Sequence, residues 1–260
     1  MALTPHRSFM VLMYHEIGTL DRAPLDSSPG YLRYVVTRKE FAQQLGTIRA
    51  SGLRGCSLGE MLSDQSHEAA IVLSFDDGCA TDLLEAAPLL QDAKFNATFF
   101  VVADLVGRSG YLSKAGVQEL AARGFEIGSH GRSHRFLTQL SQPDLEDELA
   151  GSKHELEAMT GGVIEHLSCP GGRWNRMVAE SATRLGYRSV STSRVARNGP
   201  NTDLTRLARI AVRRGASPDR FAQRCRGKGL IREQVRAGLL SGLRRILGDS
   251  RYDTLQRRLG

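Results

Sequence analysis

Long apolar runs are missing from this sequence, and no stretch approaches the roughly 18–20 consecutive apolar residues that a membrane-spanning helix requires. The N-terminal region contains a short apolar stretch, but Tyr14, His15 and Glu16 end it, and no small-residue cleavage site follows. We therefore expect a β-strand there rather than a signal peptide.

Cysteine is also scarce, with residues that lie far apart and form no CxxC pair: Cys56, Cys79, Cys169 and Cys225. This pattern excludes a small disulfide-stapled protein and favours reduced thiols, as in a cytoplasmic protein. Internal repeats, low-complexity blocks and glycine-serine linkers are absent as well. Because 41% of the 260 residues are hydrophobic and 24% are charged, the chain has the length and composition to bury a sizeable core.

Negative charge is scarce only in the C-terminal part of the chain. Residues 206–260 hold 15 Lys and Arg against 4 Asp and Glu, whereas the other residues hold 20 against 24. From residue 217 onward we expect a basic amphipathic helix, with apolar residues at four-residue spacing: Ile231, Val235, Leu239, Leu243 and Leu247. Such a helix either docks on the rest of the protein, lies on an anionic membrane surface, or contacts nucleic acid. No recognised nucleic-acid module surrounds it, so we expect no nucleic acid partner.

Short β-rich runs alternate with segments of helical periodicity. The predicted strands are 10–14, 71–75, 97–102, 125–128, 165–169, 188–192 and 208–212, and the predicted helices are 38–51, 81–91, 113–123, 144–160 and 175–185. Several runs are apolar throughout, as in parallel strands buried on both faces. The alternation favours an α/β fold of βαβ units in an incomplete barrel, with a doubly wound open sheet as the alternative. Residues 18–36 are expected to form a long loop.

Two adjacent aspartates follow the second predicted strand, in the motif Leu73-Ser-Phe-Asp-Asp-Gly78. In α/β barrels the carboxyl ends of the strands hold the active site, so Asp76 and Asp77 would reach one pocket. The same motif also suits a simple turn that ends the strand and caps the next helix.

Two histidines follow the fourth predicted strand, in Gly128-Ser-His-Gly-Arg-Ser-His134. On one helical turn, His130 and His134 would share a face and could bind one metal ion. Read alone, they are equally compatible with exposed surface residues. Together with one of the paired aspartates, the two histidines would complete a metal site with three protein ligands. The other aspartate would then be available as a general base.

A glycine-rich turn follows the fifth predicted strand, in His166-Leu-Ser-Cys-Pro-Gly-Gly-Arg-Trp174. Backbone N–H groups in such a turn can approach a substrate closely and stabilise an oxyanion. Trp174, the only tryptophan, either stacks on a sugar ring or packs in the core.

In this order and spacing, SFDDG, SHGRSH and CPGG resemble the leading motifs of the polysaccharide deacetylase (NodB-like) family, carbohydrate esterase family 4. VLMYHEI near the N-terminus is similar to the lead-in of one branch, and the resemblance runs from about residue 9 to 215. It implies a distorted, incomplete (β/α)7 barrel, and the basic helical tail lies C-terminal to the region that it covers. By position, it implies Asp77, His130 and His134 as metal ligands, Asp76 as the catalytic base and the Gly171 N–H as an oxyanion donor.

The resemblance also implies a cofactor and a reaction. The cofactor is a divalent metal, with Zn²⁺ favoured and Co²⁺, Ni²⁺ or Mn²⁺ compatible with the same ligands. The reaction is hydrolysis of N-acetyl groups on N-acetylglucosamine units of a polysaccharide or its precursor, as in bacterial exopolysaccharide biosynthesis. A metal-dependent amidase for a small C–N substrate and a catalytically inert glycan-binding or membrane-associated module are the alternatives.

The sequence departs from the family pattern at two functional positions. Many members have an arginine that contacts the base, but Ser168 occupies that position here, and Arg173 would be the substitute. The usual late histidine is also missing, because no histidine follows His166. The general acid is therefore unassigned: His15 is the preferred candidate, ahead of His166 and a protonated Asp76.

These observations divide the chain into two parts. Residues 1–216 form the predicted catalytic barrel, with the family-like core at about 68–215, and residues 217–260 form the basic amphipathic tail. We expect a cytoplasmic protein that lies peripherally at the inner membrane through this tail.

Overall fold

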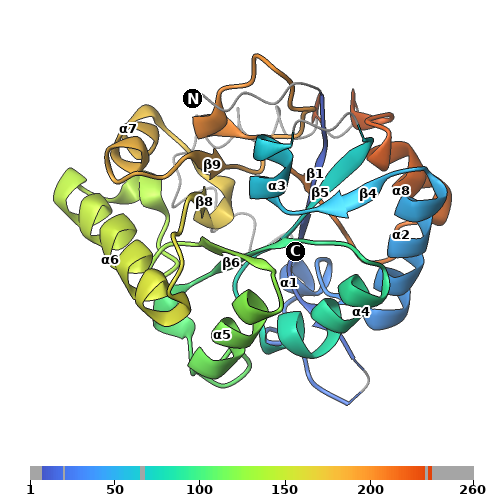
Figure 1. Ribbon diagram of the computed structural model, residues 1–260, viewed down its shortest axis with the longest axis horizontal. Coiled ribbons are helices and arrows are strands. Elements are labelled where there is room, and N and C mark those ends of the chain that lie inside the picture. Colours follow the sequence, from blue (N-terminus) through green and yellow to red (C-terminus); the bar gives the residue numbers. More distant parts are fainter. Residues whose placement is uncertain (1–7, 20, 65–67, 232–233, 236–260) are drawn as a thin grey trace.

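The centre of the protein is a curled sheet of parallel strands with helices packed around its outside (Figure 1). This computed structural model describes residues 8–19, 21–64, 68–231 and 234–235. Along the sheet the strand order is β10-β1-β5-β6-β7-β8-β9. The strands are β1 (Val11–Tyr14), β5 (Ala70–Phe75), β6 (Thr98–Val101), β7 (Glu126–Ser129), β8 (His166–Ser168), β9 (Ser189–Ser191) and β10 (Ile210–Ala211).

The sheet forms the incomplete barrel that the sequence predicts, rather than an open doubly wound sheet. A parallel bridge between Ser191 and Leu207 brings the segment before β10 against β9. Each predicted strand lies on the main path of the sheet. The predicted helices are also present, as α2 (Arg38–Ala50), a π-helical turn at Asp82–Ala86 that continues into α4 (Ala87–Asp92), α5 (Lys114–Ala122), α6 (Gln142–Thr160) and α7 (Arg176–Arg184).

Several short elements differ from the sequence prediction. The expected loop at residues 18–36 contains α1 (Pro29–Leu32) and the start of β3 (Val36–Thr37), which pairs with β2 (Ile17–Gly18). Two further elements were not expected, namely β4 (Arg54–Cys56), which pairs with β5, and α3 (Leu58–Ser63). All of these elements are too short for a periodic pattern to show in the sequence.

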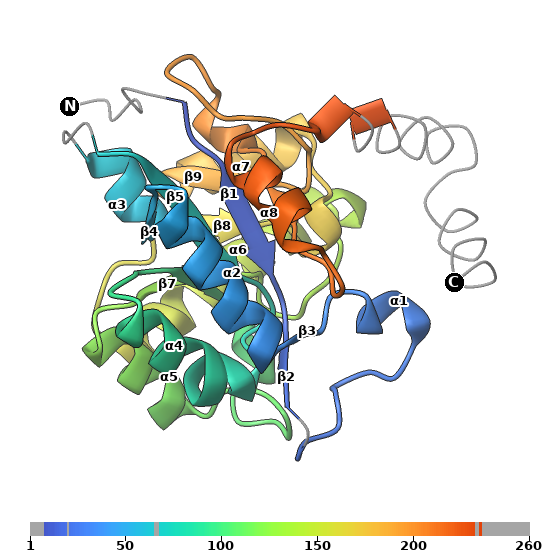
Figure 2. The same cartoon turned by 90° about the vertical axis from the view of Figure 1, so that its right-hand side faces the viewer.

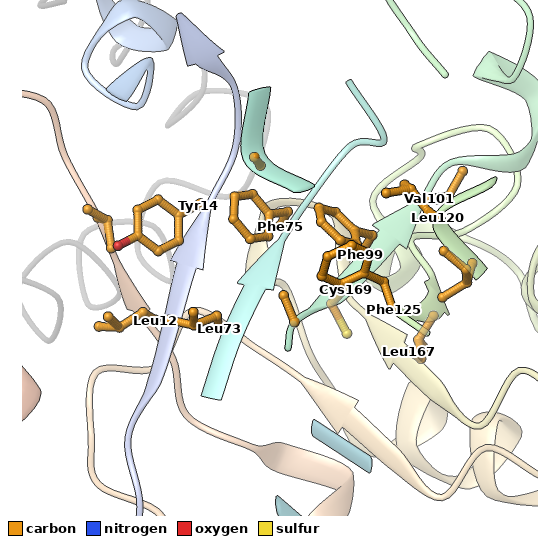
Figure 3. Close-up of a cluster of buried hydrophobic side chains, with 14 of the residues drawn as sticks. Leu12, Tyr14, Leu73, Phe75, Phe99, Val101, Leu120, Phe125, Leu167 and Cys169 are labelled. Atoms are coloured by element: carbon orange, nitrogen blue, oxygen red, sulfur yellow. The ribbon is translucent and has the colours of Figure 1, made fainter. Parts of the chain in front are cut away.

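The core has a layer on each face of the sheet because side chains alternate along each strand. In Figure 3, Tyr14, Phe75 and Phe99 lie in a row across β1, β5 and β6, with ring centroids 5.1 and 4.9 Å apart. The alternate residues Val11 and Val72 belong to a second buried cluster that includes residues of α3. Because Tyr14 and Phe75 end β1 and β5, this packing fixes the residues that follow the two strands.

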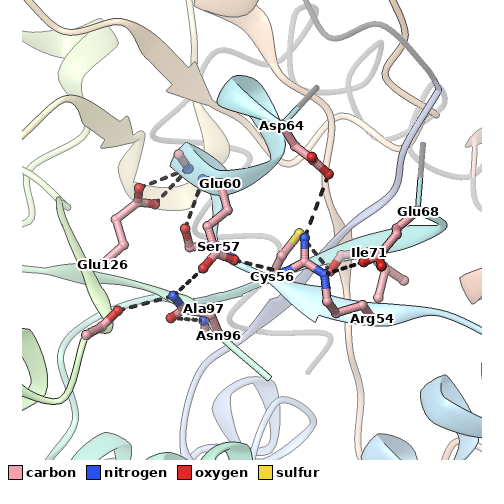
Figure 4. Close-up of polar contacts among 12 residues, drawn as sticks. Arg54, Cys56, Ser57, Glu60, Asp64, Glu68, Ile71, Asn96, Ala97 and Glu126 are labelled. Atoms are coloured by element: carbon pink, nitrogen blue, oxygen red, sulfur yellow. Dashed lines mark hydrogen bonds and ion pairs between the residues drawn. The ribbon is translucent and has the colours of Figure 1, made fainter. Parts of the chain in front are cut away.

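Helix α3 lies at the amino-terminal ends of the strands, where the polar contacts of Figure 4 hold it. The Glu126 carboxylate, at the start of β7, accepts the Gly59 N–H at 2.9 Å and the Thr98 hydroxyl. His166 Nε2 lies 3.6 Å from Glu126 Oε1, and its Nδ1 lies 2.8 Å from Ser189 Oγ. Burial lowers the pKa of His166 to about 4 and raises that of Glu126 to about 6. A neutral His166 at this end of the barrel does not fit the role of general acid at the opposite end.

The helical layer continues past residue 216, into the part of the chain that the sequence predicts as the basic tail. Helix α8 (Pro218–Cys225) packs beside α2 in Figure 2, and its Phe221 and Cys225 belong to the main core. Further along, Ile231 and Val235 are 75% and 58% exposed. The predicted continuation of this apolar stripe, at Leu239, Leu243 and Leu247, lies outside the described residues.

None of the helices in the described ranges combines the length and apolar character needed to cross a membrane. All four cysteines are buried, and no disulfide joins them.

Candidate metal and catalytic centre

The two aspartates occupy a strained turn directly after β5. The Asp76 N–H donates to the Tyr14 carbonyl at 3.0 Å and thereby extends the pairing of β5 with β1. Asp77 has φ of +83° and Gly78 has φ of +73°. The left-handed region is costly for a residue with a Cβ, and such strain concentrates at functional sites. The turn places a fully enclosed Asp76 beside a slightly more exposed Asp77.

The two histidines lie on a bent loop after β7, so the helical turn expected from their spacing is wrong. The His130 N–H donates to the Val101 carbonyl at 2.9 Å, and His134 adopts φ of +62°. Glu148, buried on α6, holds the loop by accepting the Ser133 N–H at 2.6 Å and the Ser133 hydroxyl at 2.8 Å. This bend brings the centroids of the two imidazoles to 5.0 Å.

Asp77, His130 and His134 converge, as the sequence predicts for the metal ligands. The His130 and His134 Nε2 atoms lie 3.4 and 3.3 Å from Asp77 Oδ1, and the three ligand atoms lie within 4.8 Å of one another. His130 Nδ1 lies 2.9 Å from the Ser168 carbonyl, which directs Nε2 toward Asp77, a common arrangement for a metal-binding histidine. Although burial opposes it, hydrogen bonding from both histidines holds the pKa of Asp77 well below its usual range.

One carboxylate and two imidazoles are a donor set that suits a divalent transition metal such as Zn²⁺. His130 is buried, whereas the His134 side chain is 42% exposed, so the site opens to solvent on the His134 side. The residues therefore fit a catalytic metal site, in which protein ligands leave room for water and substrate.

Asp76 is paired with a buried arginine that the sequence analysis missed. Arg209 Nη1 lies 2.7 Å from Asp76 Oδ1, and Arg209 Nη2 lies 2.8 Å from Oδ2. The Ser168 hydroxyl donates to Asp76 Oδ2 at 3.2 Å and accepts from Arg209 at 2.7 Å. Burial would raise the pKa of Asp76, but the charge of Arg209, with that of His130, lowers it below its ordinary value. Asp76 is therefore ionised and held in one orientation.

Arg173, expected as the partner of the base, has a different position. Its guanidinium lies over the Phe136 ring, 3.4 Å from the centroid. Arg209 immediately precedes β10 and reaches Asp76 from that side of the barrel. The sequence did contain a signal, because a lone arginine in an otherwise apolar buried strand needs an anionic partner.

The glycine-rich turn lies at the end of β8, on the same edge of the sheet. Gly171 and Gly172 have φ of +62° and +66°, and a Cβ on Gly171 would come within 2.7 Å of the Phe136 ring. Only glycine therefore fits this turn. Trp174 has a packing role, since its Nε1 donates to the Thr205 carbonyl at 2.6 Å and the Arg206 guanidinium lies 4.6 Å from its ring centroid.

His15 follows β1 on the edge that carries the aspartates. Its ring centroid lies 5.1 Å from that of Tyr34, and its buried Nδ1 has no hydrogen-bond partner among the described residues. Burial lowers the pKa of His15, while the charges of Asp77 and Asp76 oppose this effect. The next residue, Glu16, accepts the Tyr31 hydroxyl at 2.9 Å and thereby anchors the segment that contains α1.

Comparisons with known proteins agree with this arrangement. The model of the polysaccharide deacetylase family matches residues 63–190. The Bacillus subtilis protein YxkH, whose name assigns it provisionally to the polysaccharide deacetylases, is 27% identical over 81% of this chain and 74% of its own length. The Bacillus cereus peptidoglycan-N-acetylglucosamine deacetylase is 31% identical over 48% of this chain, which spans 57% of that relative. The Streptococcus pyogenes deacetylase PplD superposes with a TM-score of 0.74 at 25% identity, covering 84% of this chain and 98% of PplD.

Proposed function

Because the chain belongs to the polysaccharide deacetylase family and is a deacetylating hydrolase, we propose that it removes N-acetyl groups from N-acetylglucosamine units of a polysaccharide or its precursor in a metal-dependent reaction. The convergence of Asp77, His130 and His134 beside an arginine-paired Asp76 carries this proposal. The Bacillus cereus relative is named for N-acetylglucosamine, and PplD was solved with acetate, the product that deacetylation releases.

The three convergent residues would hold the divalent metal. A cation bound there supplies Lewis-acid polarisation of the amide carbonyl. His130 is fixed by the Ser168 carbonyl and His134 by its bent loop, so both present Nε2 toward Asp77 before any ligand binds. We favour Zn²⁺, with Co²⁺, Ni²⁺ or Mn²⁺ as alternatives.

Asp76 is the proposed general base. Arg209 and Ser168 keep its carboxylate ionised and oriented, so it can accept a proton from the attacking water. The water oxygen then bonds to the acetyl carbon, and the Gly171 N–H donates to the developing oxyanion. Cleavage of the C–N bond, with a proton delivered to the nitrogen, releases acetate and the free amine.

His15 is our proposed donor of that last proton. We expect His15→Ala to lower kcat about 10²-fold and to remove the alkaline limb of the pH–rate profile, since the donor must be protonated. Because burial lowers the pKa of His15, the wild-type limb should lie at lower pH than for an exposed imidazole. His154→Ala, an exposed histidine on α6, is the control. An unchanged limb in His15→Ala would assign the proton to another group, with protonated Asp76 as the alternative.

Metal content and acetate release test the function together. Purified protein should contain about one divalent metal per chain and release acetate from N-acetylglucosamine oligomers. Asp77→Ala should lose both, because it removes the carboxylate ligand. Asp147→Ala, which removes an acid whose side chain is 77% exposed, should keep both. Metal bound equally by Asp77→Ala would refute the site, and a metal-loaded protein that releases no acetate from these oligomers would refute the substrate class.

We also propose a cytoplasmic protein that contacts the inner membrane peripherally. The support is the exposure of Ile231 and Val235 at the start of a segment rich in arginine. A chain ending after residue 228 should then no longer float with vesicles that contain phosphatidylglycerol, whereas the full chain should. Equal flotation of both would end this proposal.

A further inference from the structure

A polar hollow, the arginine hollow, lies on the connection between β9 and β10. Its volume is about 510 Å³, and its lining contains three arginines, Arg194, Arg197 and Arg206, with Asn201, Thr202 and Asp203. In Figure 2 this orange connection lies beside the start of β1, where Asn198 pairs with Phe9. None of these six residues belongs to the candidate metal and catalytic centre.

The charges of this arginine hollow are not balanced by the protein. Among the described residues, no carboxylate lies within ion-pair distance of Arg194, Arg197 or Arg206. Asp203 is the single acid in the lining, and its Oδ1 already accepts the Thr205 N–H at 2.8 Å and the Thr205 hydroxyl at 2.7 Å. Burial, followed by the charge of Arg206, lowers the pKa of Arg194, although the charge of Asp203 opposes this shift. The guanidinium groups therefore repel one another, and a bound anion would relieve this repulsion.

All three arginines are exposed, and contacts with the protein restrict two of them. Arg206 stacks on Trp174, and Arg197 Nη2 donates to the Arg226 carbonyl at 3.1 Å. The connection itself is fixed by the buried Asn198, whose amide donates to the Ala208 carbonyl and whose oxygen accepts the Ala208 N–H, both at 2.9 Å. Donors that are restricted in this way lose less conformational entropy when a ligand binds.

We propose that the arginine hollow binds the phosphate or diphosphate group of an anionic ligand. Planar guanidinium groups donate two parallel hydrogen bonds to phosphate oxygens, and three of them line this hollow against a single acid, Asp203. Asn201 and Thr202 add neutral donors to the lining. This chemistry is shared by soluble sugar phosphates and by the headgroups of anionic lipids.

A calorimetric titration of the full-length protein with pyrophosphate at low salt tests the site. We expect Arg194→Gln and Arg206→Gln each to weaken binding about tenfold, because each removes a charge-assisted hydrogen bond. Arg176→Gln removes the same charge from a side chain that is 89% exposed, and it should change affinity less than about twofold. Asp77→Ala should retain pyrophosphate binding, which separates the hollow from the predicted metal site. Thermal unfolding of each variant checks that it is folded.

A competition experiment distinguishes the two sources of phosphate. If pyrophosphate displaces the protein from phosphatidylglycerol vesicles, and Arg194→Gln binds those vesicles more weakly, the ligand is a lipid headgroup. If pyrophosphate binds through the hollow but does not affect vesicle binding, the ligand is a soluble phosphate ester. The proposal is overturned if pyrophosphate does not bind, or if Arg194→Gln and Arg206→Gln bind it as Arg176→Gln does.

Discussion

Asp76→Asn should lower kcat for acetate release about 10³-fold while the protein keeps its metal, because general-base catalysis contributes 10²–10⁴-fold. Asparagine has the shape of aspartate and can still accept the Ser168 hydroxyl bond, but it cannot take a proton from water. Acetate release and metal content measured on the same preparation check this expectation. Asp77→Asn should lose metal as well as activity. The metal content of the two variants therefore distinguishes the general base, Asp76, from the metal ligand, Asp77.

Asp82→Asn is the matched control for this substitution. Asp82 is fully buried, neither of its carboxylate oxygens has a hydrogen-bond partner among the described residues, and burial raises its pKa well above the usual range. Burial and the neighbouring carboxylates thus favour the neutral form of Asp82, which an asparagine resembles. Activity should stay within about twofold of the wild type. If Asp76→Asn were as active as Asp82→Asn, the base would have to be another group.

The fold was largely predictable because its strands are short apolar runs that are buried on both faces. Residues 71–75 and 97–102 could be recognised in this way, and their alternation with helices predicts a parallel barrel. The division at residue 216 followed the changed character of the tail sequence, which does not indicate where packing against the core ends. Docking of α8 depends instead on Phe221 and Cys225, four residues apart on one face of a helix that is otherwise polar and basic.

The residues with chemistry were found from local motifs, whereas those that hold them in place were not. His130 and His134 were paired by a helical spacing that the structure does not contain, since a bend with a left-handed His134 brings them together. Glu148 was missed because nothing in the sequence distinguishes it from the other acids of α6. Its burial against Ser133 depends on tertiary packing.

Arg209 shows most clearly what the sequence leaves open, because its place in an apolar strand signals an anionic partner but does not identify Asp76. This pair leads to the largest stability prediction. Arg209 lies 133 positions from Asp76 in the sequence, within the predicted strand 208–212. Arg209→Met should reduce the free energy of unfolding by about 3–5 kcal/mol, because it leaves Asp76 as a buried carboxylate without its cation. Urea denaturation measures this loss. Arg176→Met, which breaks an exposed ion pair with Glu180, should cost less than about 1 kcal/mol.

A double substitution shows whether Arg209→Met loses stability through the broken ion pair with Asp76 or through lost packing of the arginine side chain. If the loss in Arg209→Met comes from the uncompensated charge of Asp76, then Arg209→Met combined with Asp76→Asn should be more stable than Arg209→Met alone, although it carries one more substitution. A loss caused only by the missing arginine stem would instead persist or grow.

Arg209→Lys keeps the charge but not the two parallel hydrogen bonds, so it should recover most of the stability and less of the activity. Because Arg209 orients Asp76 rather than touching the substrate, these losses should fall on kcat with KM little changed. An Arg209→Met protein with wild-type kcat would show that the pairing serves stability alone.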